Sequence, residues 1–225
     1  MGAPPVCDGF LRGHGPVLVY RSHVGETPVV VKRLAGDADA VSRRRFERER
    51  RFAGLLLHPG LPRLLAEGED WIAFEALEDA LSEPAIAARF KEPATVRPLL
   101  AALADTLAFT HARGVVHRDL KPAHVLFRGS RPVLIDFGIA GTPGDDLQRE
   151  EFSGSPAWMA PEQFSGEQVG PAADMWSFSA LGLFLLTGEK PYAGDAEAVL
   201  RRRAAGERPG FVISAMLERE DPLLL

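Results

Sequence analysis

The sequence has one cysteine, Cys7, and no long hydrophobic run. A single cysteine allows no internal disulfide, so a small fold held together by disulfides is excluded. The most apolar stretch, residues 175–186, is interrupted by serines and is too short to cross a bilayer. The first residues lack the basic and apolar segments of a secretory signal. We therefore expect a cytoplasmic protein that makes no membrane contact.

Positive charge is not in excess either. The 225 residues contain 26 Lys and Arg against 31 Asp and Glu, a formal net charge of -5, which argues against general nucleic-acid binding. Six arginines gather in residues 43–51, but glutamates are interleaved with them, and this pattern favours a solvated helix face. With 46% hydrophobic and 25% charged residues, the composition is typical of one globular domain with a substantial core.

Residues 117–138, HRDLKPAHVLFRGSRPVLIDFG, carry the most informative pattern in the chain. They contain two carboxylates, Asp119 and Asp136, and two short apolar runs at 125–127 and 133–135. The break between the runs is rich in turn formers, so the pattern predicts a β-hairpin with one polar loop before it and another after it. Such a hairpin places both carboxylates at the same end, facing one cavity.

HRDLKP at 117–122, DFG at 136–138 and a later APE at 160–162 occur here in the order that is typical of protein kinases. Over residues 10–222 the chain resembles the eukaryotic-like Ser/Thr protein kinases of bacteria. The resemblance implies an α+β, two-lobed fold in a single domain, residues 1–225. A small β-rich N-lobe would cover about residues 10–77, and a mainly helical, shortened C-lobe would cover about residues 78–225.

The resemblance also implies roles for the central residues. Asp119 would accept the proton of the acceptor hydroxyl, and Lys121 would steady the γ-phosphate. Asp136 would bind Mg²⁺ through a hard oxygen. His124 stands where the family has an asparagine that binds the second metal ion, and an imidazole nitrogen favours transition metals. Three alternatives follow: the protein works with one well-held metal ion, it prefers Mn²⁺, or its catalysis is impaired.

On the nucleotide side, Lys32 ends a valine-rich strand and resembles the lysine that holds the α- and β-phosphates. A helix predicted over residues 39–57 carries Glu49, its expected partner; Glu47, on another helical face, is the fallback. Gly13 and Gly15 match the first two glycines of a phosphate-covering G-x-G-x-x-G loop, although Leu18 stands at the third.

Residues 74–77 resemble the hinge of kinases, in which main-chain groups bind adenine. Glu75 and Leu77 would then contact the nucleotide, although an ordinary edge strand has the same pattern. A strongly periodic helix is predicted over residues 94–113. Its His111 is expected to be a packed or surface histidine without a chemical role.

Residues 141–162 resemble the activation segment. Ser155 takes the position of a threonine that touches the catalytic aspartate, and Ser153 and Ser155 are candidate phosphorylation sites. Arg118 would bind a phosphate placed there. Further on, Asp174 resembles the residue at the start of a large buried helix that accepts main-chain N–H groups of the catalytic loop.

These observations predict a kinase that transfers the γ-phosphate of ATP to Ser or Thr hydroxyls of proteins, its own included. ATP and Mg²⁺, or Mn²⁺, would be the cofactors. The first alternative is a pseudokinase that binds nucleotide or protein partners without efficient catalysis. The second is a kinase of small molecules; the Lys-Pro pair at 121–122 and the segment at 154–162, which suit a docked peptide, argue against it.

Overall fold

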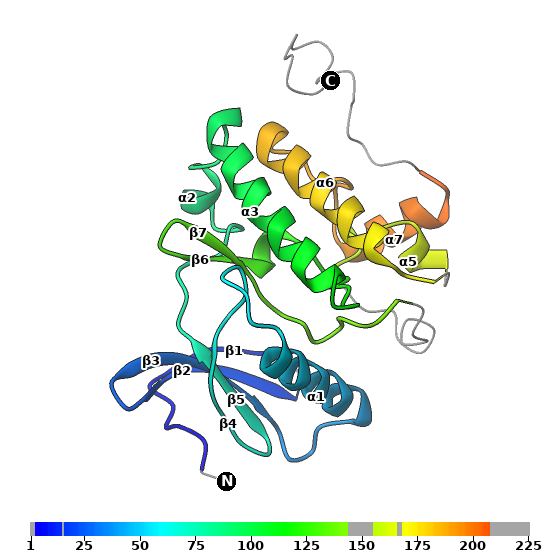
Figure 1. Cartoon of the computed structure of the whole chain (residues 1–225). Helices are drawn as coiled ribbons and strands as arrows, with labels where there is room; N and C mark the ends of the chain where they lie inside the picture. Colours follow the sequence, from blue (N-terminus) through cyan, green and yellow to red (C-terminus); the bar gives the residue numbers. More distant parts are fainter. Residues whose placement is uncertain (1–2, 15, 144–154, 166–167, 208–225) are drawn as a thin grey trace.

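The structure is a computed structural model, and it describes residues 3–14, 16–143, 155–165 and 168–207. It has the α+β, two-lobed arrangement expected from the sequence: a sheet with one helix beside it forms one lobe, and helices with a short hairpin form the other (Figure 1). Gly15 and Ser153, named above as candidate site residues, lie outside the described residues, as do residues 208–225.

The N-lobe is built on a five-stranded antiparallel sheet in the order β1-β2-β3-β5-β4. In β3, Val29 and Val31 are buried and Val30 is only partly covered, the alternation of a strand with one face on a core. The strands are β1 (Gly9–His14), β2 (Val17–Val24), β3 (Thr27–Leu34), β4 (Leu64–Glu67) and β5 (Trp71–Glu75).

Helix α1 (Ala40–Leu55) lies against this sheet, within two residues of the predicted bounds. Asp39 caps it, because its side chain accepts a hydrogen bond of 2.7 Å from Ser42 N. The buried residues Phe46, Glu49 and Phe52 follow one another at intervals of three, so they share a face. A carboxylate therefore sits on the apolar face of this helix, while Glu47 is exposed.

The C-lobe is organised around two helices that pack side by side, α3 (Pro93–His111) and α6 (Pro171–Thr187) (Figure 1). Leu99, Leu103 and Leu107 of α3 are buried at a spacing of four, as the predicted periodicity requires. After α3, Gly114 has φ +70°, a left-handed conformation in which glycine is favoured at helix C-termini. The chain then turns directly into the HRD loop.

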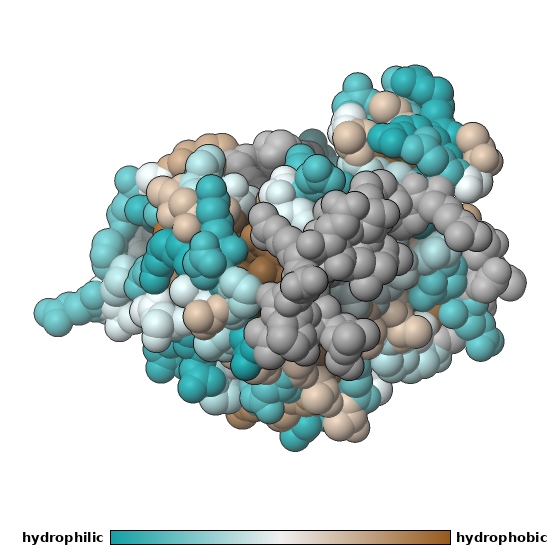
Figure 2. Space-filling model, turned by 90° about the horizontal axis from the view of Figure 1, so that it is seen from above, coloured by the Kyte–Doolittle hydropathy of each residue, from teal (hydrophilic) through white to brown (hydrophobic). Residues whose placement is uncertain are grey.

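The predicted hairpin is present as β6 (Val125–Arg128) paired with β7 (Arg131–Leu134), and a 3-10 turn, η1 (Pro122–His124), precedes it. The remaining helices are α2 (Pro84–Ala87), α5 (Glu162–Ser165) and α7 (Ala196–Ala204). Within the described part of the chain, no helix is both long and apolar enough to span a membrane. Among the coloured residues of the face shown in Figure 2, hydrophilic and intermediate ones outnumber strongly hydrophobic ones, and the buried apolar side chains of the helices meet in the core.

Candidate active site

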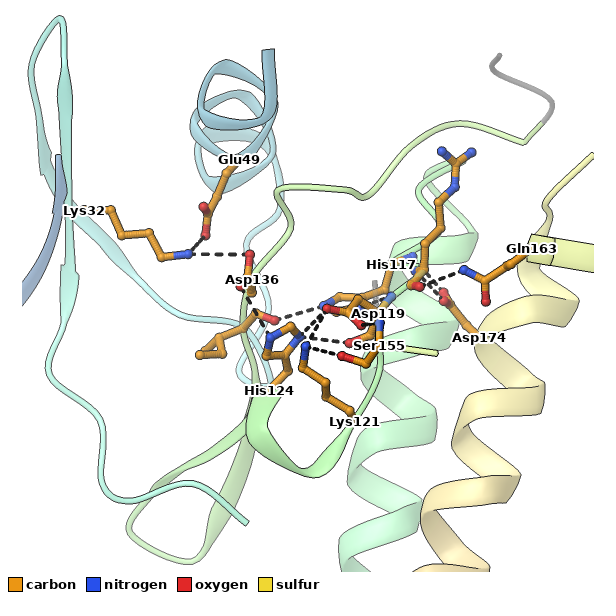
Figure 3. A network of polar contacts seen from close by, with 12 residues as sticks. Lys32, Glu49, His117, Asp119, Lys121, His124, Asp136, Ser155, Gln163 and Asp174 are labelled. Atoms are coloured by element: carbon orange, nitrogen blue, oxygen red, sulfur yellow. Dashed lines mark hydrogen bonds and ion pairs between the residues drawn. The ribbon is translucent and has the colours of Figure 1, made fainter. Parts of the chain in front are cut away.

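A cleft of about 980 Å³ is lined by residues of both lobes. Its described lining includes strands β2 and β3, helix α1, the chain after β5 and the loops on both sides of the β6–β7 hairpin. Six residues to which the sequence assigned a role in phosphate transfer meet in this cleft: Lys32, Glu49, Asp119, Lys121, His124 and Asp136. Figure 3 shows their side chains converging from separate elements.

Lys32 projects from β3 toward α1. Its Nζ lies 2.5 Å from Glu49 Oε1 and 3.6 Å from Asp136 Oδ1 (Figure 3). Burial disfavours the charged amine, but the carboxylates of Asp136 and Glu49 outweigh it and raise the pKa of Lys32 above its ordinary value. Burial also raises the pKa of Glu49, although Lys32 opposes this. The pairing that the sequence favoured is therefore formed, and Glu47 contacts Arg50 on the other side of the helix.

Asp136 begins the DFG loop with φ +70°, in the left-handed region. For a residue other than glycine this conformation costs on the order of 1–2 kcal/mol, and such strain gathers at functional sites. Its carboxylate lies between Lys32 and His124 (Figure 3). Partial loss of hydration opposes the charged form, but nearby positive charge, above all that of Lys32, holds the pKa of Asp136 well below its usual range.

His124 is held by η1 with only 9% of its side chain exposed. Its Nδ1 lies 2.9 Å from Asp119 O, and a carbonyl oxygen only accepts, so Nδ1 donates this hydrogen bond. Burial lowers the pKa of His124 to about 4, and the imidazole is therefore neutral at pH 7. The lone pair is then on Nε2, 3.4 Å from Asp136 Oδ2. Two electron-pair donors thus converge on one point, an arrangement that suits a cation.

On the opposite wall, Asp119, Lys121 and Ser155 form a closed set of contacts (Figure 3). Lys121 Nζ lies 2.8 Å from Asp119 Oδ2 and donates a hydrogen bond of 2.7 Å to Ser155 Oγ. Ser155 N donates to Asp119 Oδ1 at 3.0 Å, so both oxygens of this carboxylate are oriented by the protein. The sequence predicted that Ser155 touches this aspartate. In the structure the main-chain N–H of Ser155 makes that contact, and its hydroxyl contacts Lys121.

Asp174, in the first turn of α6, holds the HRD loop. This fully buried carboxylate accepts hydrogen bonds of 2.8 Å from His117 N and from Arg118 N, as the sequence predicted. Arg118 has φ +70°, and these bonds hold its strained backbone. His111 Nε2 lies 2.7 Å from Asp174 Oδ2. His111, expected to be a packed or surface histidine without a chemical role, thus makes a structural contact with the carboxylate that holds the loop.

Two further residues that sequence reasoning missed hold the segment at 155–163. Gln163 is buried; its Nε2 donates to Arg118 O and its Oε1 accepts from Ala160 N, both at 2.9 Å. Ser177 Oγ donates to Trp158 O at 2.7 Å. No periodicity marks these contacts in the sequence, because Gln163 reaches Arg118 O and Ser177 reaches Trp158 O, main-chain atoms 45 and 19 positions away.

Arg118 was predicted to bind a phosphate on the activation segment. Its side chain is buried, and Nη2 donates a hydrogen bond of 2.9 Å to Thr142 O. The guanidinium therefore contacts the start of that segment through its main chain. Ser153, the other predicted partner, lies outside the described residues, so the phosphate site stays a prediction.

Leu77, among other described residues, lines the part of the cleft for which adenine contact was predicted, but Glu75 does not. Glu75 N donates to Arg63 O at 3.0 Å, and the Glu75 carboxylate binds the side chains of Arg63 and of Arg128 from β6. These arginine contacts outweigh burial and lower the pKa of Glu75. Its side chain thus links the end of β5 to the C-lobe hairpin, and main-chain contact with adenine remains a prediction. Gly13 lies in β1 opposite Leu18.

Comparison with known proteins agrees with this geometry. The family described as "Protein kinase domain" matches residues 13–215. The serine/threonine-protein kinase PkaA of Streptomyces coelicolor is 40% identical over 210 residues, covering 84% of this chain and 37% of that protein. A probable serine/threonine-protein kinase of the same organism is 32% identical, with 87% and 33% covered.

The serine/threonine-protein kinase PknJ of Mycobacterium tuberculosis is 34% identical over 183 residues, covering 76% of this chain and 31% of that protein. The chain spans about a third of the length of these three relatives. The family match covers most of the chain, and one relative that is a kinase is 40% identical. Both agree with the residues that the structure brings together in the cleft. The chain belongs to the protein kinase domain family, and its relatives include bacterial eukaryotic-like Ser/Thr kinases.

Proposed function

We propose that the protein transfers the γ-phosphate of ATP to Ser or Thr hydroxyls of protein substrates, including its own. One observation carries the proposal: two carboxylates face the same cleft with different partners. Asp136 lies beside Lys32, and Asp119 is oriented by Lys121 and Ser155. Phosphoryl transfer needs this division, because one side must hold charged phosphates and the other must orient a hydroxyl.

The acceptor side acts through Asp119. Its carboxylate lies at hydrogen-bonding distance from Ser155 N and Lys121 Nζ, so its oxygens have a set direction toward the cleft. A hydroxyl that enters there would donate its proton to a positioned base, which typically accelerates a reaction by a factor of about 10² to 10⁴. Lys121 would add a positive charge beside the phosphate being transferred.

The nucleotide side fits ATP with a divalent cation. Lys32 is a buried, fully protonated point charge held by Glu49, as phosphate binding requires. Asp136 offers a hard oxygen and His124 offers the Nε2 lone pair to one metal ion. When bound, such an ion neutralises phosphate charge during transfer. Imidazole nitrogen suits Mn²⁺ better than Mg²⁺. The three alternatives for His124 therefore remain: the protein uses one well-held metal ion, it prefers Mn²⁺, or its catalysis is impaired.

The test is incorporation of labelled phosphate from ATP into a generic basic protein and into the chain itself, with Mg²⁺ and Mn²⁺ compared. Phosphoamino-acid analysis identifies the acceptor residue. We expect phosphoserine and phosphothreonine, and their loss in Asp119→Asn. In His124→Asn we expect a higher Mg²⁺-to-Mn²⁺ activity ratio if the imidazole sets metal preference.

The alternative from another class is a pseudokinase. The incomplete glycine pattern, with Leu18 at the third position, and His124 favour it. Turnover separates the two, because both can bind nucleotide: a kinase binds ATP with its metal, as calorimetry measures, and also turns it over, whereas a scaffold does not turn it over. No incorporation with either metal, in the wild type and in His124→Asn, would establish the pseudokinase and exclude the proposed activity.

A further inference from the structure

Helix α7 carries an arginine that reaches back to the activation segment. Arg203 Nη1 donates hydrogen bonds to two main-chain carbonyls, Pro156 O at 3.1 Å and Met159 O at 2.6 Å. The neighbouring arginines of α7 behave differently, because Arg201 pairs with Glu197 one turn earlier and Arg202 pairs with Glu207. Only Arg203 of these three connects α7 to residues more than forty positions earlier in the chain.

The guanidinium of Arg203 also stands among three aromatic rings. Its Cζ lies 3.7 Å from the ring centre of Phe164, 4.8 Å from that of Tyr192 and 5.6 Å from that of Trp176. Burial lowers the pKa of Arg203, and Tyr192 and Glu162 act against this. A planar group that stacks and donates at the same time has a set orientation, and a lysine ammonium does not reproduce it.

The two carbonyls belong to a turn that begins at the catalytic contact. Trp158 N donates to Ser155 O at 2.8 Å, so residues 155–158 close a turn, and Arg203 binds the carbonyls of Pro156 inside it and Met159 just after it. Ser155 is the residue whose N and Oγ contact Asp119 and Lys121. The catalytic carboxylate and α7 are therefore connected through one short turn.

Apart from the contacts of Ser155 itself with Asp119 and Lys121, the other contacts of this turn lie at its far end. Ser177 binds Trp158 O, and Gln163 binds Ala160 N. The hydrogen bond from Arg203 to Pro156 O holds the residue directly after Ser155. Loss of the two hydrogen bonds from the Arg203 guanidinium would thus loosen the end of the turn that lies next to Asp119.

We propose that Arg203 is a positioning residue, which holds the turn at 155–159 so that Ser155 stays in contact with Asp119 and Lys121 and protein substrates meet a formed acceptor site. This inference rests on the proposed kinase function. It makes α7 part of the acceptor site, although none of the α7 residues is among the described residues that line the cleft. The nucleotide side is expected to be independent of Arg203.

The first test reports on the turn without any need for activity. The chain has three tryptophans, and incorporation of 5-fluorotryptophan gives one ¹⁹F resonance for each. Trp158 lies in the turn and Trp71 lies in the N-lobe sheet, so they serve as probe and internal reference. We expect Arg203→Gln to shift or broaden the Trp158 resonance and to leave the Trp71 resonance unchanged. Trp158→Phe assigns the probe.

Arg201→Gln is the matched control, since it removes an exposed arginine of the same helix. It is expected to leave the Trp158 resonance unchanged. An unchanged Trp158 resonance in Arg203→Gln would overturn the proposal. If Arg203→Gln does not fold, Arg203→Lys decides, because it keeps the charge and loses the fork; a Trp158 resonance identical to that of the wild type would again overturn the proposal.

The second test is kinetic. We expect Arg203→Gln to lower kcat/KM for a protein substrate by about ten- to a hundredfold, as misplacement of a catalytic contact does. The Kd for ATP should stay within about twofold, and Arg203→Lys should fall in between. Equal losses in substrate turnover and ATP affinity would indicate a merely structural role and contradict positioning. If the wild type transfers no phosphate, the proposed function fails, and the Trp158 resonance alone decides whether Arg203 holds the turn.

Discussion

The two walls of the cleft are held in different ways. The nucleotide wall consists of side-chain charges from two lobes: Lys32 and Glu49 come from the N-lobe sheet and helix, and Asp136 comes from the C-lobe. The acceptor wall is built within the C-lobe, where a buried carboxylate, Asp174, binds main-chain N–H groups of the loop that carries Asp119. Ion pairs between side chains hold the nucleotide wall, and hydrogen bonds to main-chain N–H groups hold the acceptor wall.

This difference follows from what each wall would have to bind. Phosphates and a metal ion are strongly charged, and complementary point charges attract them without narrow angular limits. An acceptor hydroxyl is neutral, so the position of the base decides the reaction, and positions are best set by buried hydrogen bonds. Each wall also has one residue in a strained left-handed conformation, Asp136 in one and Arg118 in the other. The comparison predicts separate effects on ATP affinity and on turnover.

The largest effect is expected from Asp174→Asn. An amide provides one acceptor oxygen in place of two, so at least one buried N–H of His117 or Arg118 loses its partner, at a cost of about 1–3 kcal/mol each. We expect substrate turnover to fall by about a hundredfold or more and the melting temperature to fall. Activity assays and thermal unfolding measure both. Asp37→Asn, an exposed exchange of the same kind, should change neither; ATP affinity lost to the same extent as turnover would contradict separate walls.

A smaller effect, on the other wall, is expected from Glu49→Gln. The amide can still contact Lys32, but the buried charge pair is lost and Lys32 is left with Asp136 at 3.6 Å. We expect kcat/KM for ATP to fall by about tenfold, which corresponds to about 1.4 kcal/mol. Glu47→Gln is the matched control, because Glu47 is exposed on the same helix. If both variants behave alike, the Lys32–Glu49 pair does not organise the nucleotide wall.

Ser155 offers a finer distinction within the acceptor wall. Ser155→Ala removes the Oγ that accepts from Lys121 but keeps the N–H that donates to Asp119. We expect a loss of about three- to tenfold in kcat/KM for a protein substrate, in line with one hydrogen bond to a charged group. Ser155→Thr keeps the hydroxyl and should retain most of the activity. A loss in Ser155→Ala as large as that in Asp174→Asn would mean that the hydroxyl, and not the main chain, orients the base.

At neutral pH the smallest effect on folding is expected from His124→Asn, because the imidazole is already uncharged there. Its pKa is about 4 in the folded chain and about 6.5 when unfolded, so the unfolded chain binds more protons between these values. Stability therefore falls as the pH is lowered from 7 to 4, by up to about 3 kcal/mol from this group. Denaturant unfolding of the nucleotide-free chain at pH 7 and pH 4.5 should show a smaller loss in His124→Asn.

The control for this effect is His23→Asn, since His23 is exposed and lies in the N-lobe. It should lose stability with falling pH as the wild type does. An acid-induced loss that is the same in wild type and His124→Asn would contradict a His124 that burial holds neutral with a free lone pair at Nε2.

Much of the fold was predictable because its signals are local. Asp39 caps α1 and the periodicity of Leu99, Leu103 and Leu107 marks α3, and both depend on residues within a few positions of one another. The hairpin followed from two apolar runs separated by turn formers. The site was predictable only through resemblance to a family. No local pattern in the sequence indicates that Lys32 pairs with a carboxylate of the helix.

The roles of buried polar side chains were not predictable in the same way. His111 was expected to be a packed or surface histidine, and the sequence did not show that it contacts Asp174, which lies 63 positions further along the chain. Glu75 was expected to contact the nucleotide, which stays a prediction for its main chain, and the sequence did not show that Arg128, 53 positions away, binds its carboxylate. A side chain that meets a main-chain atom or a single partner at such separations leaves no periodicity in the sequence, because only one residue at each end takes part.

The sequence by itself determined which groups this protein has for its chemistry: two carboxylates flanking a hairpin, lysines beside them and a histidine where an asparagine is expected. The tertiary structure alone decided how they are held. It turned Nε2 of His124 toward Asp136, placed His111 under the catalytic loop and carried Arg203 to the turn after Ser155. The physical reason is that composition and periodicity specify which surface is buried, whereas the partner of a buried polar group depends on how separate elements pack.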